Sequence, residues 1–152
     1  MLLCVSCAMS ISDRQSGPEV LVDTSVAIAL VLADHEGHAS TMSAVSGKRL
    51  GLSGHAWYET YSVLTRLPPG ARRSPSDVLR LLDHDFPGTR FLDKRTAGAL
   101  RLDLARLGIA GGAVYDALVG AAARQHGMPL MSRDRRAIGV YEALGIQVTI
   151  IA

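Results

Sequence analysis

The sequence is poor in cysteine: Cys4 and Cys7 are its only two. A C-x-x-C pair serves redox chemistry when it follows a strand and opens a helix, and a structural zinc site needs a second pair of ligands. This pair precedes the first predicted strand, and the chain has no other cysteine. The sequence therefore gives little support to a redox or zinc role, and we expect a protein of the reducing cytoplasm.

Long apolar runs and a strong net charge are also absent. No apolar run approaches the roughly 18–20 residues that a membrane helix needs. Residues 1–18 lack the basic start of a secretion signal, so we expect a flexible extension or a start codon assigned too early, with Met9 as the initiator. The formal net charge of +2 is compatible with a nucleic-acid partner but does not demonstrate one.

What the sequence does contain is an alternation of short apolar runs and helical patterns. A chain of 152 residues that is 48% hydrophobic suits one domain with a real core, expected over residues 19–152. The predicted strands are Val20–Val22, Arg49–Ser53, Thr89–Leu92, Pro129–Met131 and Gln147–Ile151. The predicted helices are Val26–Leu32, Glu36–Ser46, Ser53–Arg66, Asp77–Asp85 with Ser76 as its cap, Thr96–Leu107, Gly111–Gln125 and one ending near Leu144. This pattern predicts an α/β fold with a parallel sheet and helices on both faces.

Four acidic residues lie at corresponding ends of these elements. Asp23 ends the first strand, and Glu59 lies on the helix after the second strand. Asp116 lies in the first turns of the helix that leads into the fourth strand, and Asp134 follows that strand. Ligands of open parallel sheets bind beyond the carboxyl ends of the strands. We therefore expect these four carboxylates to converge on one rim of the sheet.

Each acid also has a purely structural interpretation. Asp23 would cap the next helix, a role open also to Thr24 or Ser25. Asp134 would be a cap paired with neighbouring arginines, and Glu59 would be buried against an arginine. Asp116 is the hardest to explain in this way, because it is the only charge between Gly111 and Ala123. One shared site accounts for all four acids better than four unrelated roles do.

A cluster of carboxylates cannot ionise fully without a cation. Hard divalent ions such as Mg²⁺ or Mn²⁺ prefer oxygen ligands, and they serve phosphoryl transfer or phosphodiester hydrolysis by activating a bound water. Thr24, Ser25 and Ser132 lie beside the acids and are candidates to position water or a phosphate oxygen. The five histidines show no metal-ligand spacing; His35 and His38 are three residues apart, which is more typical of a surface pair.

Four segments taken together resemble a known family. They are V-L-V-D-T-S (Val20–Ser25), the helical Glu59, G-G-x-x-x-D-A-L (Gly111–Leu118) and S-R-D-R-R-A (Ser132–Ala137). Their order and spacing resemble those of the PIN-domain ribonucleases, and most closely the VapC toxins of type II toxin–antitoxin pairs. The resemblance spans about Val20 to Ile151, nearly the whole chain.

The resemblance implies a Mg²⁺- or Mn²⁺-dependent endoribonuclease whose acidic quartet maps onto Asp23, Glu59, Asp116 and Asp134. It also implies a sheet of order 3-2-1-4-5, a homodimer and a cognate VapB-type antitoxin that blocks the site. A metal-bound water would attack the phosphorus, and Asp116 or Asp134 would accept its proton. Candidates to contact the RNA backbone, each also explicable as solvated surface, are Arg72, Arg73, Arg133, Arg135 and Arg136.

Three other interpretations are weighed against this one. A haloacid-dehalogenase-type phosphatase needs a second aspartate two residues after Asp23, where this chain has Ser25. A receiver-like switch needs paired acids after the first strand, although Asp93 offers a phosphate acceptor. A PIN-like module that binds RNA or protein without cutting is the third alternative, and the sequence alone leaves it open.

Overall fold

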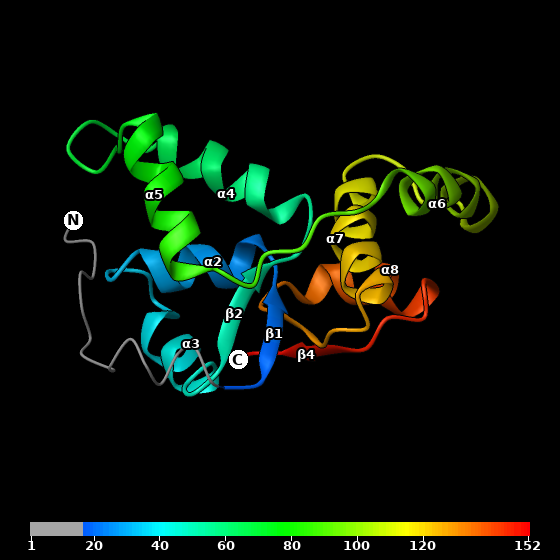
Figure 1. Ribbon diagram of the computed structural model, residues 1–152, viewed down its shortest axis with the longest axis horizontal. Coiled ribbons are helices and arrows are strands. Elements are labelled where there is room, and N and C mark those ends of the chain that lie inside the picture. The colour runs from blue at the N-terminus through cyan, green and yellow to red at the C-terminus, as the bar shows by residue number, and fades with distance from the viewer. Residues whose placement is uncertain (1–16) are drawn as a thin grey trace.

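The computed structural model describes residues 17–152, and Figure 1 shows their arrangement. The predictions for Cys4, Cys7 and the N-terminal extension therefore lie outside the described residues, apart from Gly17 and Pro18. The strands are β1 (Glu19–Val22), β2 (Arg49–Leu52), β3 (Leu130–Ser132) and β4 (Val148–Ile150). The helices are α2 (Thr24–Val31), α3 (His38–Ala44), α4 (Ala56–Thr65), α5 (Pro75–Asp85), α6 (Lys94–Leu107), α7 (Ala113–Gln125), the 3₁₀ turn η1 (Arg135–Ala137) and α8 (Ile138–Ala143).

The four strands form one parallel sheet in the order β2-β1-β3-β4. Val20, Leu21 and Val22 of the central strand β1 are all buried, as is expected of a strand covered by helices on both faces. In Figure 1, α4 and α5 lie together on one side of the molecule and α6 and α7 on the other. The α/β parallel fold predicted from the sequence is confirmed.

The predicted third strand, Thr89–Leu92, does not form, and the order 3-2-1-4-5 is corrected accordingly. The segment does run beside β2, with one parallel bridge between Ser53 and Arg90. The Leu52 N–H donates to the Thr89 hydroxyl at 3.0 Å, where a regular parallel ladder would use the Gly88 carbonyl. The preceding Pro87 has no N–H to extend the pairing. The edge of the sheet beside β2 is thus covered by an irregular segment that forms an isolated bridge with β2, and not by a fifth strand.

One of the helix caps left open by the sequence is now assigned, and another differs from its prediction. Asp23 and not Thr24 or Ser25 caps α2, because its Oδ1 accepts the Val26 N–H at 3.1 Å, whereas Thr24 and Ser25 lie inside the helix. Helix α5 is capped by Ser74, whose hydroxyl accepts the Asp77 N–H, and not by Ser76 as predicted. Pro75 therefore takes the first helical position, where its missing N–H costs nothing. The remaining predicted boundaries agree with the structure to within a few residues.

Helix α7 packs closely against its neighbours from Ala117 to Ala123, and its small residues make this possible. Ala117, Ala121 and Ala123 are fully buried, and a Cβ atom on Gly120 would lie 2.5 Å from the Ile146 side chain. Close packing of this kind fixes the rotation of α7 and so the direction of its first turn. No helix within residues 17–152 has the length and apolar character to span a membrane.

The close approach of Gly51 to the segment after α5 generates a first prediction. A Cβ atom on Gly51 would lie 2.1 Å from the backbone oxygen of Gly88, which cannot move aside as a side chain would. Gly51→Ala should therefore lower the free energy of unfolding by about 2 kcal/mol, measured by urea denaturation. Gly98→Ala is the matched control, because this helical glycine has nothing within 4 Å. It should raise stability by about 0.5 kcal/mol, and equal effects in both variants would contradict the packing argument.

Candidate active site

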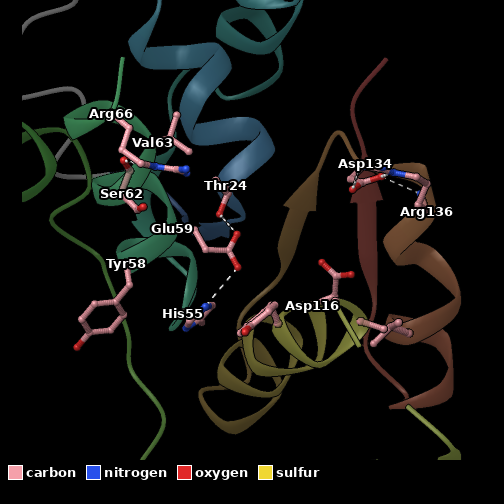
Figure 2. A pocket seen from close by; sticks show the side chains of 14 residues that line it. Thr24, His55, Tyr58, Glu59, Ser62, Val63, Arg66, Asp116, Asp134 and Arg136 are labelled. Carbon is pink, nitrogen blue, oxygen red and sulfur yellow. Dashed lines mark hydrogen bonds and ion pairs between the residues drawn. The ribbon is translucent and has the colours of Figure 1, made fainter. Parts of the chain in front are cut away.

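Three of the four predicted acids line one open cleft beyond the carboxyl ends of the strands, and the fourth lies behind it. Glu59 of α4, Asp116 of α7 and Asp134 of the loop after β3 border a cleft of about 990 Å³. In Figure 2 the Glu59 and Asp116 side chains project into the space between α4 and α7. Asp23, at the end of β1, is the buried member. The predicted convergence follows from the parallel sheet, which brings these chain segments to one edge.

Asp23 is held by three donors in a nearly closed environment. Only 6% of the residue is exposed, yet its carboxylate accepts hydrogen bonds from the hydroxyls of Ser25 and Ser132 and from the Val26 N–H. Burial raises the pKa of Asp23, although the three hydrogen bonds oppose that rise. Ser25 and Val26 approach from the first turn of α2 and Ser132 from the end of β3, so both carboxylate oxygens are held.

The two serines that contact Asp23 also fix the loop that carries Asp134. The Ser132 hydroxyl accepts the Asp134 N–H at 2.9 Å, and the Ser25 hydroxyl accepts the Arg133 N–H at 2.8 Å. Both hydroxyl protons point at Asp23. In this structure Ser25 and Ser132 therefore connect β1 to the β3 loop, and their predicted role toward water or phosphate stays a prediction.

Glu59 is oriented by two neighbours and not by a buried arginine. Thr24, the first residue of α2, donates its hydroxyl to Glu59 Oε2 at 2.8 Å. His55 Nε2 lies 3.4 Å from Oε1, one helical turn before Glu59. The Glu59 side chain is 36% exposed and faces the cleft. Thr24, predicted to position water or phosphate, positions this carboxylate here, as Figure 2 shows.

Asp116 carries the clearest electrostatic signal of the site. Its carboxylate is partly buried, and no residue within 17–152 donates a hydrogen bond to it or forms an ion pair with it. Burial is the main cause that raises its pKa to about 6, followed by the negative charges of Asp134, Glu59 and Asp23. All three other acids thus contribute to the shift at Asp116, which shows that the four carboxylates lie close enough to interact electrostatically.

Asp134 is partly neutralised by the chain itself. Arg136 approaches its carboxylate with Nε and Nη2, each at 3.0 Å, and also donates its backbone N–H. These contacts hold the pKa of Asp134 below its ordinary value. The backbone contact caps η1, so the structural interpretation of Asp134 as a cap with an ion pair is correct, and Asp134 borders the cleft as well.

The four acids offer the type of ligand that a divalent ion prefers, but their side chains do not surround a single point. Within residues 17–152, no three side chains of His, Cys, Asp or Glu approach closely enough to form a metal site. The donors are nonetheless all carboxylate oxygens, and the charges of the other three acids add to the burial that raises the pKa of Asp116. This set suits an ion such as Mg²⁺, which keeps several waters and binds few carboxylates directly.

The predicted RNA-binding arginines are distributed differently from the acids. Of the five, only Arg136 borders the cleft. The Arg133 guanidinium donates to the hydroxyls of Ser40 and Thr41 and to the Ala152 carbonyl, which ties the β3 loop to α3. Arg72 donates to the Leu67 carbonyl within its own loop. Arg133 and Arg72 therefore hold their own chain together in this structure, and their role toward RNA stays a prediction.

Several residues that border the cleft were missed by the sequence analysis. They are His55, Tyr58, Ser62, Arg66 and Tyr115. A signal existed for two of them, because His55 precedes Glu59 by four residues, one helical turn, and Tyr115 directly precedes Asp116. No sequence pattern indicates that His55 of α4 and Tyr115 of α7 meet as stacked rings, which the structure shows at 5.0 Å between centroids.

Comparison with known proteins gives a consistent picture. The family model described as PIN domain matches residues 20–143. Ribonuclease VapC27 of Mycobacterium tuberculosis (strain ATCC 25618 / H37Rv) is 46% identical over 135 residues, covering 89% of this chain and 98% of the relative. Ribonuclease VapC40 of Mycobacterium tuberculosis (strain CDC 1551 / Oshkosh) is 41% identical over 131 residues, covering 85% and 96%.

A solved structure has the same fold. The crystal structure of VapBC2 from Rickettsia felis, bound to a DNA fragment from their promoter, superposes with a TM-score of 0.63. The match covers 88% of this chain and 99% of that chain, at 11% sequence identity. At so low an identity, the likeness shows the fold alone.

The electrostatic coupling at Asp116 generates a second prediction. Because the charge of Asp134 contributes to the raised pKa, Asp134→Asn should lower the Asp116 pKa from about 6 toward 3.8. The measurement is a titration of the side-chain carboxyl carbons by NMR. A pKa of Asp116 that does not change in Asp134→Asn would show that the charge of Asp134 does not contribute to the shift.

A third prediction concerns stability and pH. A carboxyl with a raised pKa binds more protons folded than unfolded, so its contribution to stability falls as the pH rises from about 4 to about 6. Asp116→Asn removes this cost. Its gain in melting temperature over the wild type should be full above about pH 6 and should vanish below about pH 4. Asp83→Asn, at an exposed carboxyl on α5, controls for the loss of one negative charge.

Proposed function

This chain belongs to the PIN-domain family, and on that premise we propose that it is a divalent-metal-dependent endoribonuclease, the toxin of a toxin–antitoxin pair. The single observation that carries the proposal is that Glu59, Asp116 and Asp134, from three separate chain segments, border one cleft, with Asp23 buried at the end of β1. The charges of Asp134, Glu59 and Asp23 add to the burial that raises the pKa of Asp116. The names of the relatives, ribonucleases VapC27 and VapC40, support RNA as the substrate.

The metal ion would be Mg²⁺ or Mn²⁺. Asp116 and Glu59, which face the cleft, would hold it, with Asp23 and Asp134 acting directly or through water. When bound, such an ion neutralises the carboxylates and activates water for attack on a phosphodiester. The chemistry of the donors favours it, since hard oxygen ligands are those that these ions prefer.

The remaining steps belong to the chain's own residues. Asp23 is fixed by Ser25 and Ser132, and Thr24 orients Glu59, so the acids are held before substrate arrives. Asp116 is the better candidate to accept the proton of the attacking water, because Arg136 engages both oxygens of Asp134. With water and not the 2′-hydroxyl as nucleophile, the products carry a 5′-phosphate and a 3′-hydroxyl.

A protein partner and self-association complete the proposal. The related fold in Rickettsia felis was solved as a VapBC2 pair, which supports a VapB-type antitoxin for this chain. An antitoxin that covers the acidic cleft would block access of RNA to Asp116. The chain is also proposed to form a homodimer, as the resemblance implies, and to act in the cytoplasm, where RNA is available.

The fourth prediction tests the nuclease. The purified chain, freed of any partner, should cut total RNA into discrete fragments in Mg²⁺ or Mn²⁺ and should leave 5′-phosphates at the new ends. Asp116→Asn, which keeps the size of the side chain, should lower the rate by at least about a hundredfold. EDTA should abolish cutting. Fragments that persist in the variant would reveal a contaminant, and 2′,3′-cyclic phosphate ends would contradict water as the nucleophile.

The effect of Mn²⁺ on thermal stability tests metal binding independently of RNA cleavage. Mn²⁺ should raise the melting temperature of the wild type, because an ion that binds only the folded state stabilises it. The increase should be smaller in Asp116→Asn and unchanged in Asp83→Asn, whose carboxyl lies on α5 away from the cleft lining. Binding of RNA without cutting, with or without Mn²⁺, would favour a non-catalytic PIN-like module instead.

A further inference from the structure

The few aromatic residues of this chain are concentrated beside the acidic cleft. The sequence has one Trp, two Phe and four Tyr. Most of them belong, together with His55, to one connected group of rings, here called the ring cluster. Its members are His55, Trp57, Tyr58, Tyr61, Phe91 and Tyr115. Trp57 and Tyr61 of this cluster pack against the hydrophobic core, which is built mainly of Leu, Val, Ile and Ala, so the core does not account for the exposed members.

The ring cluster is attached to the acids at two points. His55 stacks on Tyr115 with ring centroids 5.0 Å apart and planes inclined by 14°. The same His55 contacts Glu59 at 3.4 Å, and Tyr115 is the residue before Asp116 on α7. The stack therefore joins α4 to α7 along the border of the cleft. Figure 2 shows His55 beside Glu59, with Tyr58 on the same side of the cleft.

Three rings of the cluster are exposed to an extent unusual for aromatic side chains. Tyr115 is 52% exposed, Tyr58 is 56% and Phe91 is 47%. One face of the Tyr115 ring lies against His55, so its exposed area includes the opposite face. Tyr58 is supported from behind by Trp57 in an edge-to-face contact at 5.3 Å. Contiguous exposed apolar surface of this kind marks a binding site.

We propose that Tyr115, backed by His55, and Tyr58 bind unpaired RNA bases next to the phosphate that is cut. Flat rings of this kind are the usual partners of single-stranded nucleic acid, because every base has a face that stacks on an aromatic side chain. A paired base inside a helix cannot reach such a ring, so the ring cluster selects RNA that is unpaired at the cut. This inference rests on the proposed ribonuclease function and adds the residues that read the substrate.

The charges around the ring cluster favour RNA over a protein as its occupant. Arg66 and Arg136 border the same cleft as Tyr58 and Tyr115 and offer cations to a phosphate backbone. A purely apolar protein surface laid on the rings would also cover Glu59 and Asp116 and leave their charges unpaired, so an antitoxin that covers the cleft needs cationic groups of its own. A nucleotide places its base on a ring and keeps its charged phosphate among the cations of the cleft.

The test measures binding and does not need cleavage. Two fluorescein-labelled strands of equal length are compared by fluorescence anisotropy in EDTA: an oligoadenylate, and a strand in which abasic spacers replace the nucleosides. The wild type should bind the oligoadenylate about tenfold more tightly, because base stacking contributes at least that order of affinity. Tyr115→Ala and Tyr58→Ala should each lose much of this preference, whereas Tyr115→Phe should keep it. Tyr115→Ala should leave the dependence of binding on salt unchanged, because stacking releases no counterions.

The controls make each outcome decisive. Leu102→Ala removes the most exposed large apolar side chain, which is 72% exposed on α6, and should leave the base preference intact. Thermal unfolding verifies that every variant is folded. The proposal is overturned if the wild type binds both strands equally, or if neither tyrosine variant changes the preference. It is also overturned if the tyrosine variants alter only self-association, which would identify the ring cluster as a protein interface.

The same samples separate this inference from the proposed function. Base-dependent binding that is lost in Tyr115→Ala, without any cutting of RNA in Mn²⁺, would support the ring cluster and contradict the nuclease. Cutting that requires Asp116, with no base preference in binding, would support the nuclease and overturn the inference about Tyr115 and Tyr58.

Discussion

The burial of one carboxylate at the end of β1 is the constraint on which the site depends. Asp23 caps α2 and accepts a hydroxyl proton from Ser25 and another from Ser132. A charged group in so closed a place would be costly without these donors. The contacts therefore bind the start of α2 and the end of β3 to the same side chain. The position of Asp134 follows, because its N–H is held by Ser132.

Much of this could be predicted from the sequence, because the local pattern carries the information. The apolar run Val20–Val22 followed by an aspartate specifies a buried strand with an acid at its carboxyl end, and parallel topology brings such ends together. The isolated charge of Asp116 on a helix of small residues was equally informative. In both cases one element and its neighbours along the chain decide where the side chain lies.

The rest depended on contacts between distant segments. The strand predicted at Thr89–Leu92 does not form, because the Leu52 N–H donates to the Thr89 hydroxyl and not to a backbone carbonyl. No local sequence pattern indicates this hydrogen bond. Arg133 resembles its neighbours in sequence, yet its guanidinium lies against Ser40 and Thr41 of α3, while Arg136 reaches the cleft. The stack of His55 on Tyr115 joins two helices that are far apart in the chain. The acids and the hydroxyls next to them in the chain could therefore be predicted, whereas the rings and the role of Arg133 could not.

The ion pair between Arg136 and Asp134 places a positive charge from the chain itself at the acidic site. An ion that took the Asp134 carboxylate as a ligand would compete with a guanidinium that makes two contacts at 3.0 Å. A guanidinium released in this way would need a new negative partner, and a phosphate of a bound strand would supply one. Loading of the ion and arrival of RNA would then favour each other, each binding more tightly in the presence of the other.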